Sequence, residues 1–198
     1  MPDGGGGRMD RRGFFTQGVA RALRETVGGF ADRVAERVAP DRYVRPPVAL
    51  PEAAFLGACT RCGACVEACP VQAITLLPAA AGLAAATPVL DVATRACIMC
   101  ETMPCAQACP TPALEVPAWG WRDARMAAVS VDQGQCIAWR DVACGICARV
   151  CPVGEDALRL DDRGRPVIGA ACTGCGQCLS ACVTTPSSLV AHPLGREG

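Results

Sequence analysis

Cys172-Thr-Gly-Cys175-Gly-Gln-Cys178-Leu-Ser-Ala-Cys182 is the unit that the rest of the chain repeats and varies. Its C-x2-C-x2-C-x3-C spacing predicts three thiolates around a tight loop and a fourth at the start of the following helix, which suits a cubane iron-sulfur cluster. Two-residue gaps let the backbone curl around the inorganic core with its amides pointing at the sulfurs. Small residues such as Gly174 and Gly176 permit that close approach. The pattern is typical of electron-transfer proteins.

Three further copies of this pattern lie upstream. Residues 59–69 keep the spacing and are followed by Pro70, as in bacterial ferredoxins. Residues 97–109 have a four-residue middle gap, and residues 136–151 have a seven-residue first gap. All sixteen cysteines therefore fall into four motifs, and none is left over. The predicted ligands are Cys59, Cys62, Cys65, Cys69, Cys97, Cys100, Cys105, Cys109, Cys136, Cys144, Cys147, Cys151, Cys172, Cys175, Cys178 and Cys182.

The motifs are expected to exchange cysteines, because in two-cluster ferredoxins the fourth cysteine of one motif serves the cluster of the other. We favour pairing of neighbouring motifs, since each pair is separated by a short segment with hairpin character. A nested arrangement, in which motif one pairs with four and two with three, stays open and uses the same ligands. Under neighbouring pairing the quartets are Cys59, Cys62, Cys65 with Cys109 (quartet one); Cys97, Cys100, Cys105 with Cys69 (quartet two); Cys136, Cys144, Cys147 with Cys182 (quartet three); and Cys172, Cys175, Cys178 with Cys151 (quartet four).

Other uses of paired cysteines fit the pattern less well. A disulfide scaffold is disfavoured because cysteines packed into short C-x2-C pairs cannot easily join distant strands, and no secretory hydrophobic segment is evident. Structural zinc usually takes two cysteines from each of two knuckles, whereas here a third and a fourth follow closely. A radical-forming cluster would need a C-x3-C-x2-C order, which the sequence lacks.

Composition limits both the fold and the function. A length of 198 residues with four motifs favours two small units with two clusters each, and an aromatic content of 4% leaves a thin apolar core. The clusters must then act as staples. The formal net charge of zero would become about −8 with thiolates and clusters counted, which gives no reason to expect nucleic-acid binding. No nucleotide fingerprint, catalytic triad or open metal site appears, so we expect an electron carrier with no catalytic residues.

The sequence divides into six segments. Residues 1–13 are expected to be a disordered leader with a twin-arginine remnant at Arg11-Arg12. Apolar residues recurring every three or four positions predict an amphipathic helix over 14–39, which would pack on its own chain, dock on a partner or lie on a membrane surface. A proline-rich linker over 40–51, dicluster ferredoxin-like units over 52–118 and 119–190, and a tail over 191–198 follow. The fold class is α+β.

Within the two units, hairpins are expected. Strands are predicted at 73–77 and 87–91, separated by an alanine-rich insert, and at 157–160 and 166–168 around an Asp-Arg-Gly turn. A further strand is expected at 126–131. Two tryptophans, Trp119 and Trp121, are expected to pack between the units. The single histidine, His192, is expected to be solvated and inert in the tail.

The motifs, in this order and with these irregular gaps, resemble the NapG/MauM family of ferredoxin-type proteins. The resemblance covers roughly residues 45–190. It rests on Arg45-Pro46-Pro47, Cys59 to Pro70, Met99-Cys100-Glu101 with Pro104-Cys105, Asp123-Ala-Arg-Met126, Val131-Asp132-Gln133, Cys144 to Pro152 and Ala171-Cys172-Thr-Gly-Cys175-Gly.

The resemblance implies four 4Fe-4S clusters that pass single electrons between a quinol-side or soluble donor and a terminal oxidoreductase. Its partners would be redox proteins, and the alternative role is an accessory or maturation factor that docks on an apo-metalloenzyme. Exported relatives carry a hydrophobic signal after the twin arginines, whereas here charged residues interrupt that run. We therefore expect a cytoplasmic protein, close in role to NapF-type accessory ferredoxins and membrane-associated through a partner, with periplasmic export as the alternative. Motif four departs from ferredoxin habit at Val183, where proline follows the other motifs.

Overall fold

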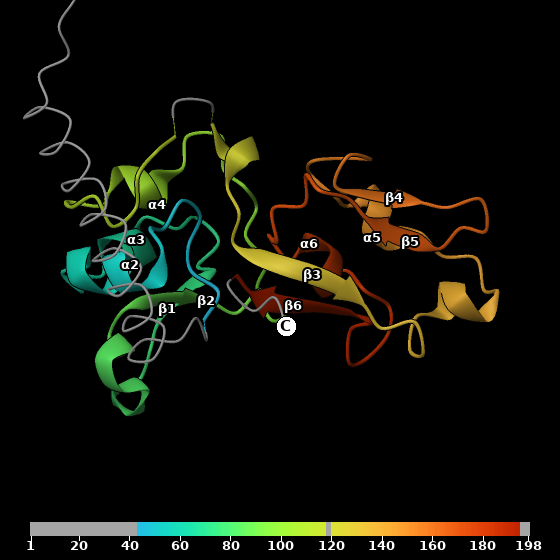
Figure 1. The fold of residues 1–198 in the computed structure, drawn as a ribbon, viewed down its shortest axis with the longest axis horizontal. Helices are drawn as coiled ribbons and strands as arrows, with labels where there is room; N and C mark the ends of the chain where they lie inside the picture. The colour runs from blue at the N-terminus through green and yellow to red at the C-terminus, as the bar shows by residue number, and fades with distance from the viewer. Residues whose placement is uncertain (1–42, 118–119, 195–198) are drawn as a thin grey trace, which may run out of the picture. The chain divides into compact units, whose positions relative to one another are not determined.

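A computed structural model describes residues 43–117 and 120–194 (Figure 1). The predictions for the leader, for the helix over 14–39 and for Trp119 lie outside the described residues. Within them, no helix is long and apolar enough to cross a membrane. The elements, in chain order, are α2 (Glu52–Ala58), α3 (Ala64–Glu67), β1 (Ile74–Leu76), η1 (Ala79–Ala84), β2 (Pro88–Leu90), α4 (Pro104–Gln107), η2 (Trp121–Asp123), β3 (Ala127–Val131), η3 (Ile137–Arg140), α5 (Ile146–Arg149), β4 (Leu158–Leu160), β5 (Pro166–Ile168), α6 (Gln177–Ser180) and β6 (Leu189–Pro193).

The described strands form two-stranded antiparallel sheets. Strands β1 and β2 pair with Ile74 opposite Leu90, and β4 and β5 pair with Leu158 opposite Ile168. Both predicted hairpins are thus confirmed. The β4–β5 turn is closed by Asp161, whose Oδ1 accepts hydrogen bonds from the backbone N–H groups of Arg163 at 2.9 Å and Arg165 at 2.8 Å. A side chain that binds its own turn in this way explains why a local sequence pattern was sufficient to predict it.

The tail predicted over residues 191–198 overlaps a strand, β6. Strand β6 pairs with β3 along its whole length, from Leu189 opposite Val131 to Pro193 opposite Ala127. His192 is exposed but not isolated, because its Nε2 lies 2.8 Å from Ser130 Oγ. The tail prediction was therefore wrong for residues 191–193. These residues are held by a strand about sixty positions upstream, and no local pattern reports such a pairing.

The segment expected to be a linker is part of the first unit. Val44 is buried, and its carbonyl accepts a hydrogen bond from Leu90 N–H at 2.8 Å beside strand β2. Leu50 N–H donates to Ala113 O at 3.1 Å, and Ala49 forms an isolated bridge with Leu114. The segment forms no helix or extended strand, but it is not extended throughout, because it turns at Pro47–Val48, where Ala49 N–H donates to Pro46 O at 3.3 Å. Its backbone groups pair with strand β2 in the middle of the unit and with residues 113–115 at its end, so residues 43–50 belong to that unit.

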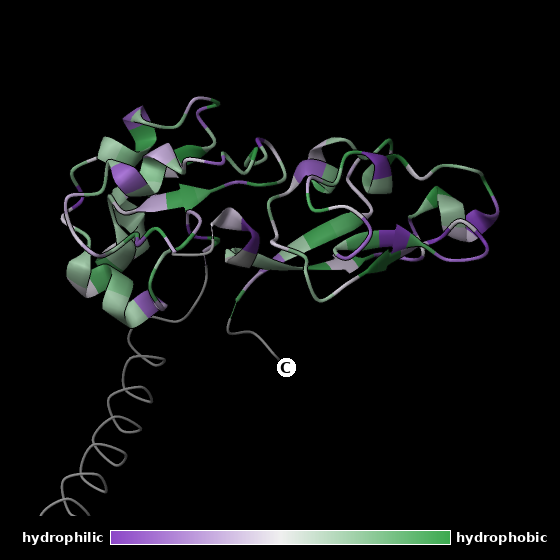
Figure 2. Ribbon diagram, turned by 90° about the horizontal axis from the view of Figure 1, so that it is seen from above, coloured by the Kyte–Doolittle hydropathy of each residue, from purple (hydrophilic) through white to green (hydrophobic). Residues whose placement is uncertain are grey.

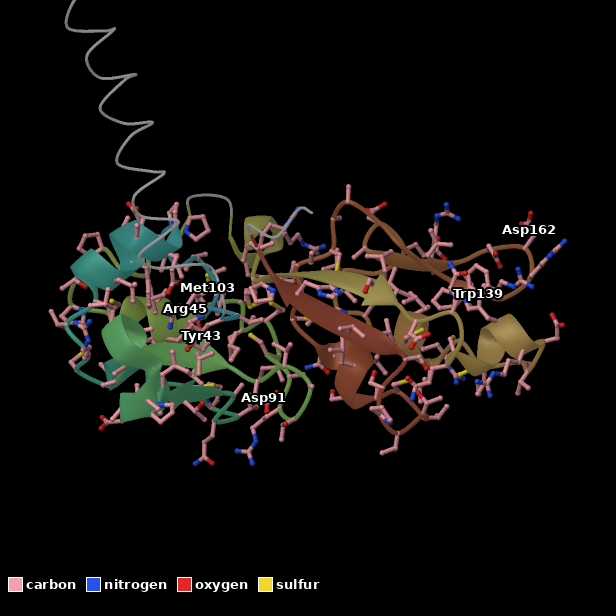
Figure 3. All side chains as sticks on the ribbon, turned by 60° about the horizontal axis from the view of Figure 1, so that its bottom comes forward. Tyr43, Arg45, Asp91, Met103, Trp139 and Asp162 are labelled. Carbon is pink, nitrogen blue, oxygen red and sulfur yellow. The ribbon has the colours of Figure 1, made fainter. Side chains whose placement is uncertain are left out.

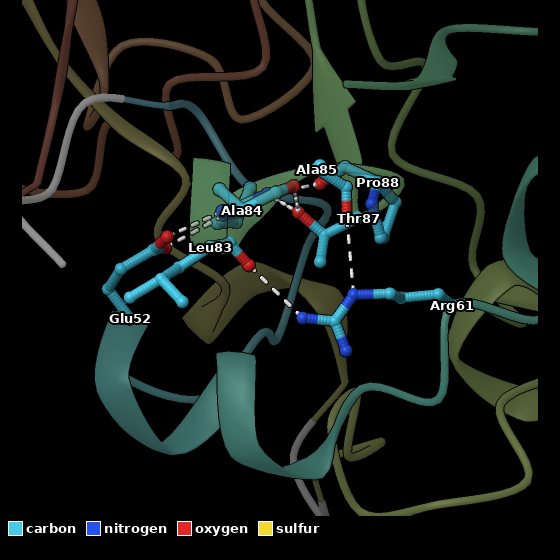
Figure 4. A network of polar contacts seen from close by, with 8 residues as sticks. Glu52, Arg61, Leu83, Ala84, Ala85, Thr87 and Pro88 are labelled. Carbon is cyan, nitrogen blue, oxygen red and sulfur yellow. Dashed lines mark hydrogen bonds and ion pairs between the residues drawn. The ribbon is translucent and has the colours of Figure 1, made fainter. Parts of the chain in front are cut away.

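Arg45 fastens this segment to α2. Its guanidinium donates from Nε to Glu52 Oε2 at 2.8 Å, and its Nη1 donates to Thr87 Oγ1 at 2.9 Å and to Pro88 O at 2.8 Å. It also lies over the rings of Tyr43, 5.2 Å from the centroid, and Phe55, 4.8 Å away. Figure 3 labels Tyr43 and Arg45 in the first unit, and Figure 4 shows Glu52, Thr87 and Pro88 from the network. Nη2 donates to Glu52 Oε1, so all three guanidinium nitrogens are hydrogen-bonded, which offsets part of the desolvation penalty of a buried ion pair.

The apolar core is thin but continuous. One cluster of buried residues includes Phe55 and Leu90 of the first unit with Leu158, Leu179 and Leu189 of the second. Hydrophobic residues are spread over the short elements of both units (Figure 2). Because the strands and helices span only three to seven residues each, they bury little apolar area alone. The cysteine-lined pockets between them must supply the rest of the stabilisation.

Removing the Arg45 side chain should destabilise the first unit. In Arg45→Ala the Glu52 carboxylate would remain buried without its partner, which typically costs about 3–5 kcal/mol. We expect a clear fall in the thermal unfolding midpoint, measured by circular dichroism on anaerobic holoprotein. The double variant Arg45→Met/Glu52→Leu should unfold at a higher temperature than Arg45→Ala, since it leaves no buried charge. An unchanged midpoint in Arg45→Ala would contradict this role.

Candidate cluster-binding sites

Each motif contains a short helix that positions its third cysteine. The residue before each helix adopts a left-handed backbone, Gly63 at φ 80°, Gly145 at 86°, Gly176 at 84° and Met103 at 46°. The third cysteines therefore lie in the helices, and the fourth cysteines follow the helix ends. The prediction that the fourth cysteine starts the helix was wrong. Each helix begins earlier because the left-handed residue, two positions before the third cysteine, already turns the chain.

Three of the four predicted quartets each line a single pocket. The pockets of quartets one, two and four contain about 330, 420 and 300 Å³ of space between atoms, open solvent included. Each is walled mainly by apolar side chains and thiols. The fourth cysteine in each pocket comes from the neighbouring motif, and not from the nested partner. The sets are Cys59, Cys62, Cys65 and Cys109; Cys97, Cys100, Cys105 and Cys69; and Cys172, Cys175, Cys178 and Cys151.

Quartet three is less completely assembled. Cys136 and Cys144 lie near enough to Cys147 to add to the rise in its pKa that burial causes. The long gap between Cys136 and Cys144 is taken up by η3, so the insertion does loop away as the spacing requires. Cys182 follows α6, and its sulfur is within hydrogen-bond distance of the Thr184 hydroxyl. Its membership of this quartet stays a prediction.

The donor set fits an iron-sulfur cube. All sixteen cysteines are free thiols, without a disulfide. Among the described residues, no three His, Cys, Asp or Glu side chains converge closely enough to hold one metal ion. The sulfurs of three quartets instead surround a hollow, as thiolates must when they bind the corners of a multi-atom core. The remaining lining is mainly apolar, which suits a cofactor that is screened from water.

Burial sets the protonation of these thiols when no iron is bound. Burial raises the pKa of Cys65 and of Cys105 to about 11, and that of Cys97 and of Cys178 to about 12. These four thiols therefore keep their protons at neutral pH when no iron is bound. Only a positively charged partner can hold them as buried thiolates, so loading of the pockets must release protons. Cluster assembly should be favoured as the pH rises toward these values.

Cys62 and Cys182 differ from the ligand candidates whose pKa burial raises. Hydrogen bonds from the Ala64 backbone and the Thr60 side chain lower the pKa of Cys62. The causes at Cys182 are different. Burial opposes its ionisation, but hydrogen bonds from Thr184 and Ser188 outweigh burial and lower its pKa to about 7. Thr184 Oγ1 accepts a hydrogen bond from Ser188 N–H at 2.9 Å and lies 3.2 Å from Cys182 Sγ and 2.7 Å from Ser188 Oγ. Its hydroxyl proton can therefore be donated to the sulfur or to the Ser188 hydroxyl. Motif two has a weaker counterpart, with Thr111 Oγ1 3.7 Å from Cys109 Sγ. Val183 stands where proline follows the fourth cysteine of the other motifs, and the loop after it places polar groups around Cys182.

The alanine-rich insert is held against motif one by Arg61. Its Nε donates to Ala85 O and its Nη2 to Leu83 O, each at 3.1 Å (Figure 4). The adjacent Cys62 is the one exposed cysteine among the sixteen, all of which lie in the described part of the chain. Quartet one therefore reaches the surface, whereas each of the other cysteines is buried or partly buried. The sequence carried no signal for the Arg61 contacts, because carbonyl groups about twenty positions away accept them.

Comparison with known proteins agrees with this geometry. Residues 58–113 and residues 128–183 each match the 4Fe-4S dicluster domain. The methylamine utilization ferredoxin-type protein MauM of Paracoccus denitrificans is 41% identical over 179 residues, which cover 84% of this chain and 80% of the relative. The ferredoxin-type protein NapG of Escherichia coli is 40% identical over 163 residues, covering 76% and 71%. The chain belongs to the NapG/MauM family of ferredoxin-type proteins.

NapF is a more distant relative of this NapG/MauM chain. The ferredoxin-type protein NapF of Escherichia coli is 32% identical over 156 residues, covering 75% of this chain and 87% of the relative. No solved structure matches. The cofactors are 4Fe-4S clusters, and two dicluster domains with sixteen cysteines match four of them. The family resemblance drawn from the sequence is confirmed, as are the two tandem dicluster units.

The hydroxyl of Thr184 should raise the reduction potential of the cluster that Cys182 binds. A hydrogen bond to a thiolate stabilises the more negative, reduced state, so its loss lowers the potential. Replacing Thr184 by Val should lower one midpoint by roughly 40 mV, the equivalent of about 1 kcal/mol for one electron. Redox titration followed by electron paramagnetic resonance would measure it. Thr111→Val, at the longer contact, should shift its midpoint less, and equal shifts would refute the distance argument.

Proposed function

We propose that this protein relays single electrons through four 4Fe-4S clusters, from a quinol-side or soluble donor to a terminal oxidoreductase. The observation that carries the proposal is the convergence of cysteines from neighbouring motifs on common pockets in both units. Two dicluster domains and the ferredoxin-type relatives support it. The clusters supply the chemistry, which is reversible uptake of one electron each.

The chain's own residues would hold the clusters, shield them from water and leave one of them accessible to a partner. Cysteines from two motifs close each pocket, so that neither motif can release its ligands without opening the other. Apolar neighbours such as Met99 and Met103, both buried, keep water from quartet two. At quartet one, Cys62 is exposed and gives a partner protein access to one edge of the relay. Such an exposed edge beside a shielded interior is what an electron carrier requires, since transfer needs close approach but no bound substrate.

Anaerobically purified protein should contain about sixteen iron atoms per chain and show broad visible absorption that dithionite bleaches. Removing the iron with a chelator should unfold both units, because binding and folding are coupled when a core is this thin. Iron analysis, absorption and circular dichroism measure these outcomes. Two to four zinc atoms per chain without visible absorption would refute the cluster assignment.

Deleting residues 1–40 separates a relay from an assembly factor. A relay should keep its reducible clusters and its electron exchange, because all cysteines lie after residue 58. An assembly factor that docks through its N-terminal segment should lose partner binding, with little effect on redox turnover. The measurements are dithionite reduction and reoxidation kinetics for the relay, and co-purification with a candidate oxidoreductase for docking. Loss of partner binding with unchanged redox turnover would favour the assembly role.

A further inference from the structure

Two cysteines from different units are joined directly through their backbones. Cys97, the first cysteine of motif two, donates its N–H to the carbonyl of Cys175 in motif four at 2.9 Å. The carbonyl of Cys97 in turn accepts a hydrogen bond from Gln177 Nε2 at 3.2 Å. Both polar backbone groups of Cys97 are therefore bound by motif four. Cys97 lines the pocket of quartet two, and Cys175 lines that of quartet four.

The contact is close because motif four has a glycine at the critical position. A Cβ atom added to Gly176 would lie 2.4 Å from Val92 O and 2.5 Å from Val92 Cβ, so no side chain fits there. Val92 belongs to the first unit and is buried, as is Cys175. The equivalent Gly63 of motif one has a similar φ, 80° against 84°, yet an added Cβ would meet nothing within 4 Å. The closeness at Gly176 is thus a property of the contact between units and not of the motif.

A short path of bonds runs through this contact. It passes from the sulfur of Cys97 along its side chain to its N–H, crosses one hydrogen bond to the carbonyl of Cys175, and continues to the sulfur of Cys175. Cys175 and Val92 at this contact are buried, and Cys97 is partly buried. In the described part of the chain, Gln177 and Cys175 are the residues of motif four that hydrogen-bond to Cys97.

We propose that electrons cross between the two units at the hydrogen bond between Cys97 and Cys175, with Gly176 and Gln177 as positioning residues. This inference rests on the proposed function. The step moves one electron, so the group held by one quartet is oxidised and the group held by the other is reduced, and no bond forms or breaks. The relay then runs from quartet one through two and four to three, because exchanged cysteines join one with two and four with three.

The test compares three anaerobic holoproteins: wild type, Gly176→Ala and Gly63→Ala. Both substitutions place alanine at the same motif position with the same left-handed backbone, but Gly176→Ala alone pushes against Val92. Electron paramagnetic resonance of the fully reduced proteins measures the magnetic interaction between clusters. Interaction within each unit remains in all three proteins, so a difference reports the contact between units. Iron content, about sixteen atoms per chain, checks loading.

We expect Gly176→Ala to lose the between-unit part of the interaction and Gly63→Ala to match the wild type. Gln177→Ala provides a second variant, because motif one carries Ala64 at this position and alanine there is compatible with the motif. Gln177→Ala should weaken the magnetic interaction between the units. If Gly176→Ala takes up too little iron, Gln177→Ala alone tests the crossing point. Fully loaded variants with the wild-type spectrum would overturn the crossing point while leaving the relay intact. Wild-type protein without iron would overturn the relay itself.

Discussion

The structure depends on the exchange of one cysteine between neighbouring motifs. Cys109 lies in the pocket of motif one, Cys69 in that of motif two and Cys151 in that of motif four. Each exchange ties two loops that are far apart in the sequence, in a chain whose helices are mostly a single turn long. Such short elements cannot bury enough apolar surface to offset the conformational entropy of folding. The free energy of cofactor binding must make up the difference, so cofactor binding and folding are coupled.

Polar contacts hold in place the segments that the cysteines do not. The Arg45–Glu52 pair draws residues 43–50 into the first unit, and Arg61 holds the alanine-rich insert on motif one. Between the units, the Cys97 and Gln177 hydrogen bonds fix how closely motif four approaches motif two. These are hydrogen bonds with strict geometry, in contrast to the loose packing that small apolar residues allow. For a relay, that distinction matters because electron exchange depends on a constant short separation.

Sequence reasoning succeeded where the information was local. The cysteine spacing, the two hairpins and the glycine positions follow from patterns within about fifteen residues, and the relatives agree with the family they indicate. It failed where the partner was distant. Strand β6 forms only by pairing with β3, and residues 43–50 are held by backbone hydrogen bonds to Leu90 and residues 113–115. The helix starts were misplaced by a few residues because the motif was treated as a loop, although its left-handed residue already begins the turn.

The sequence by itself determined the chemistry: sixteen cysteines at these spacings are suited to iron-sulfur cubes, and two motifs make a unit. It left the pairing of motifs open, since the neighbouring and nested schemes use the same ligands. The tertiary structure favoured neighbours in three pockets and brought Cys97 against Cys175. The physical reason is that ligand identity is set by side-chain type and local spacing. Which cysteines meet, and how nearly two units touch, is set by hydrogen bonds and steric contacts between segments about eighty residues apart.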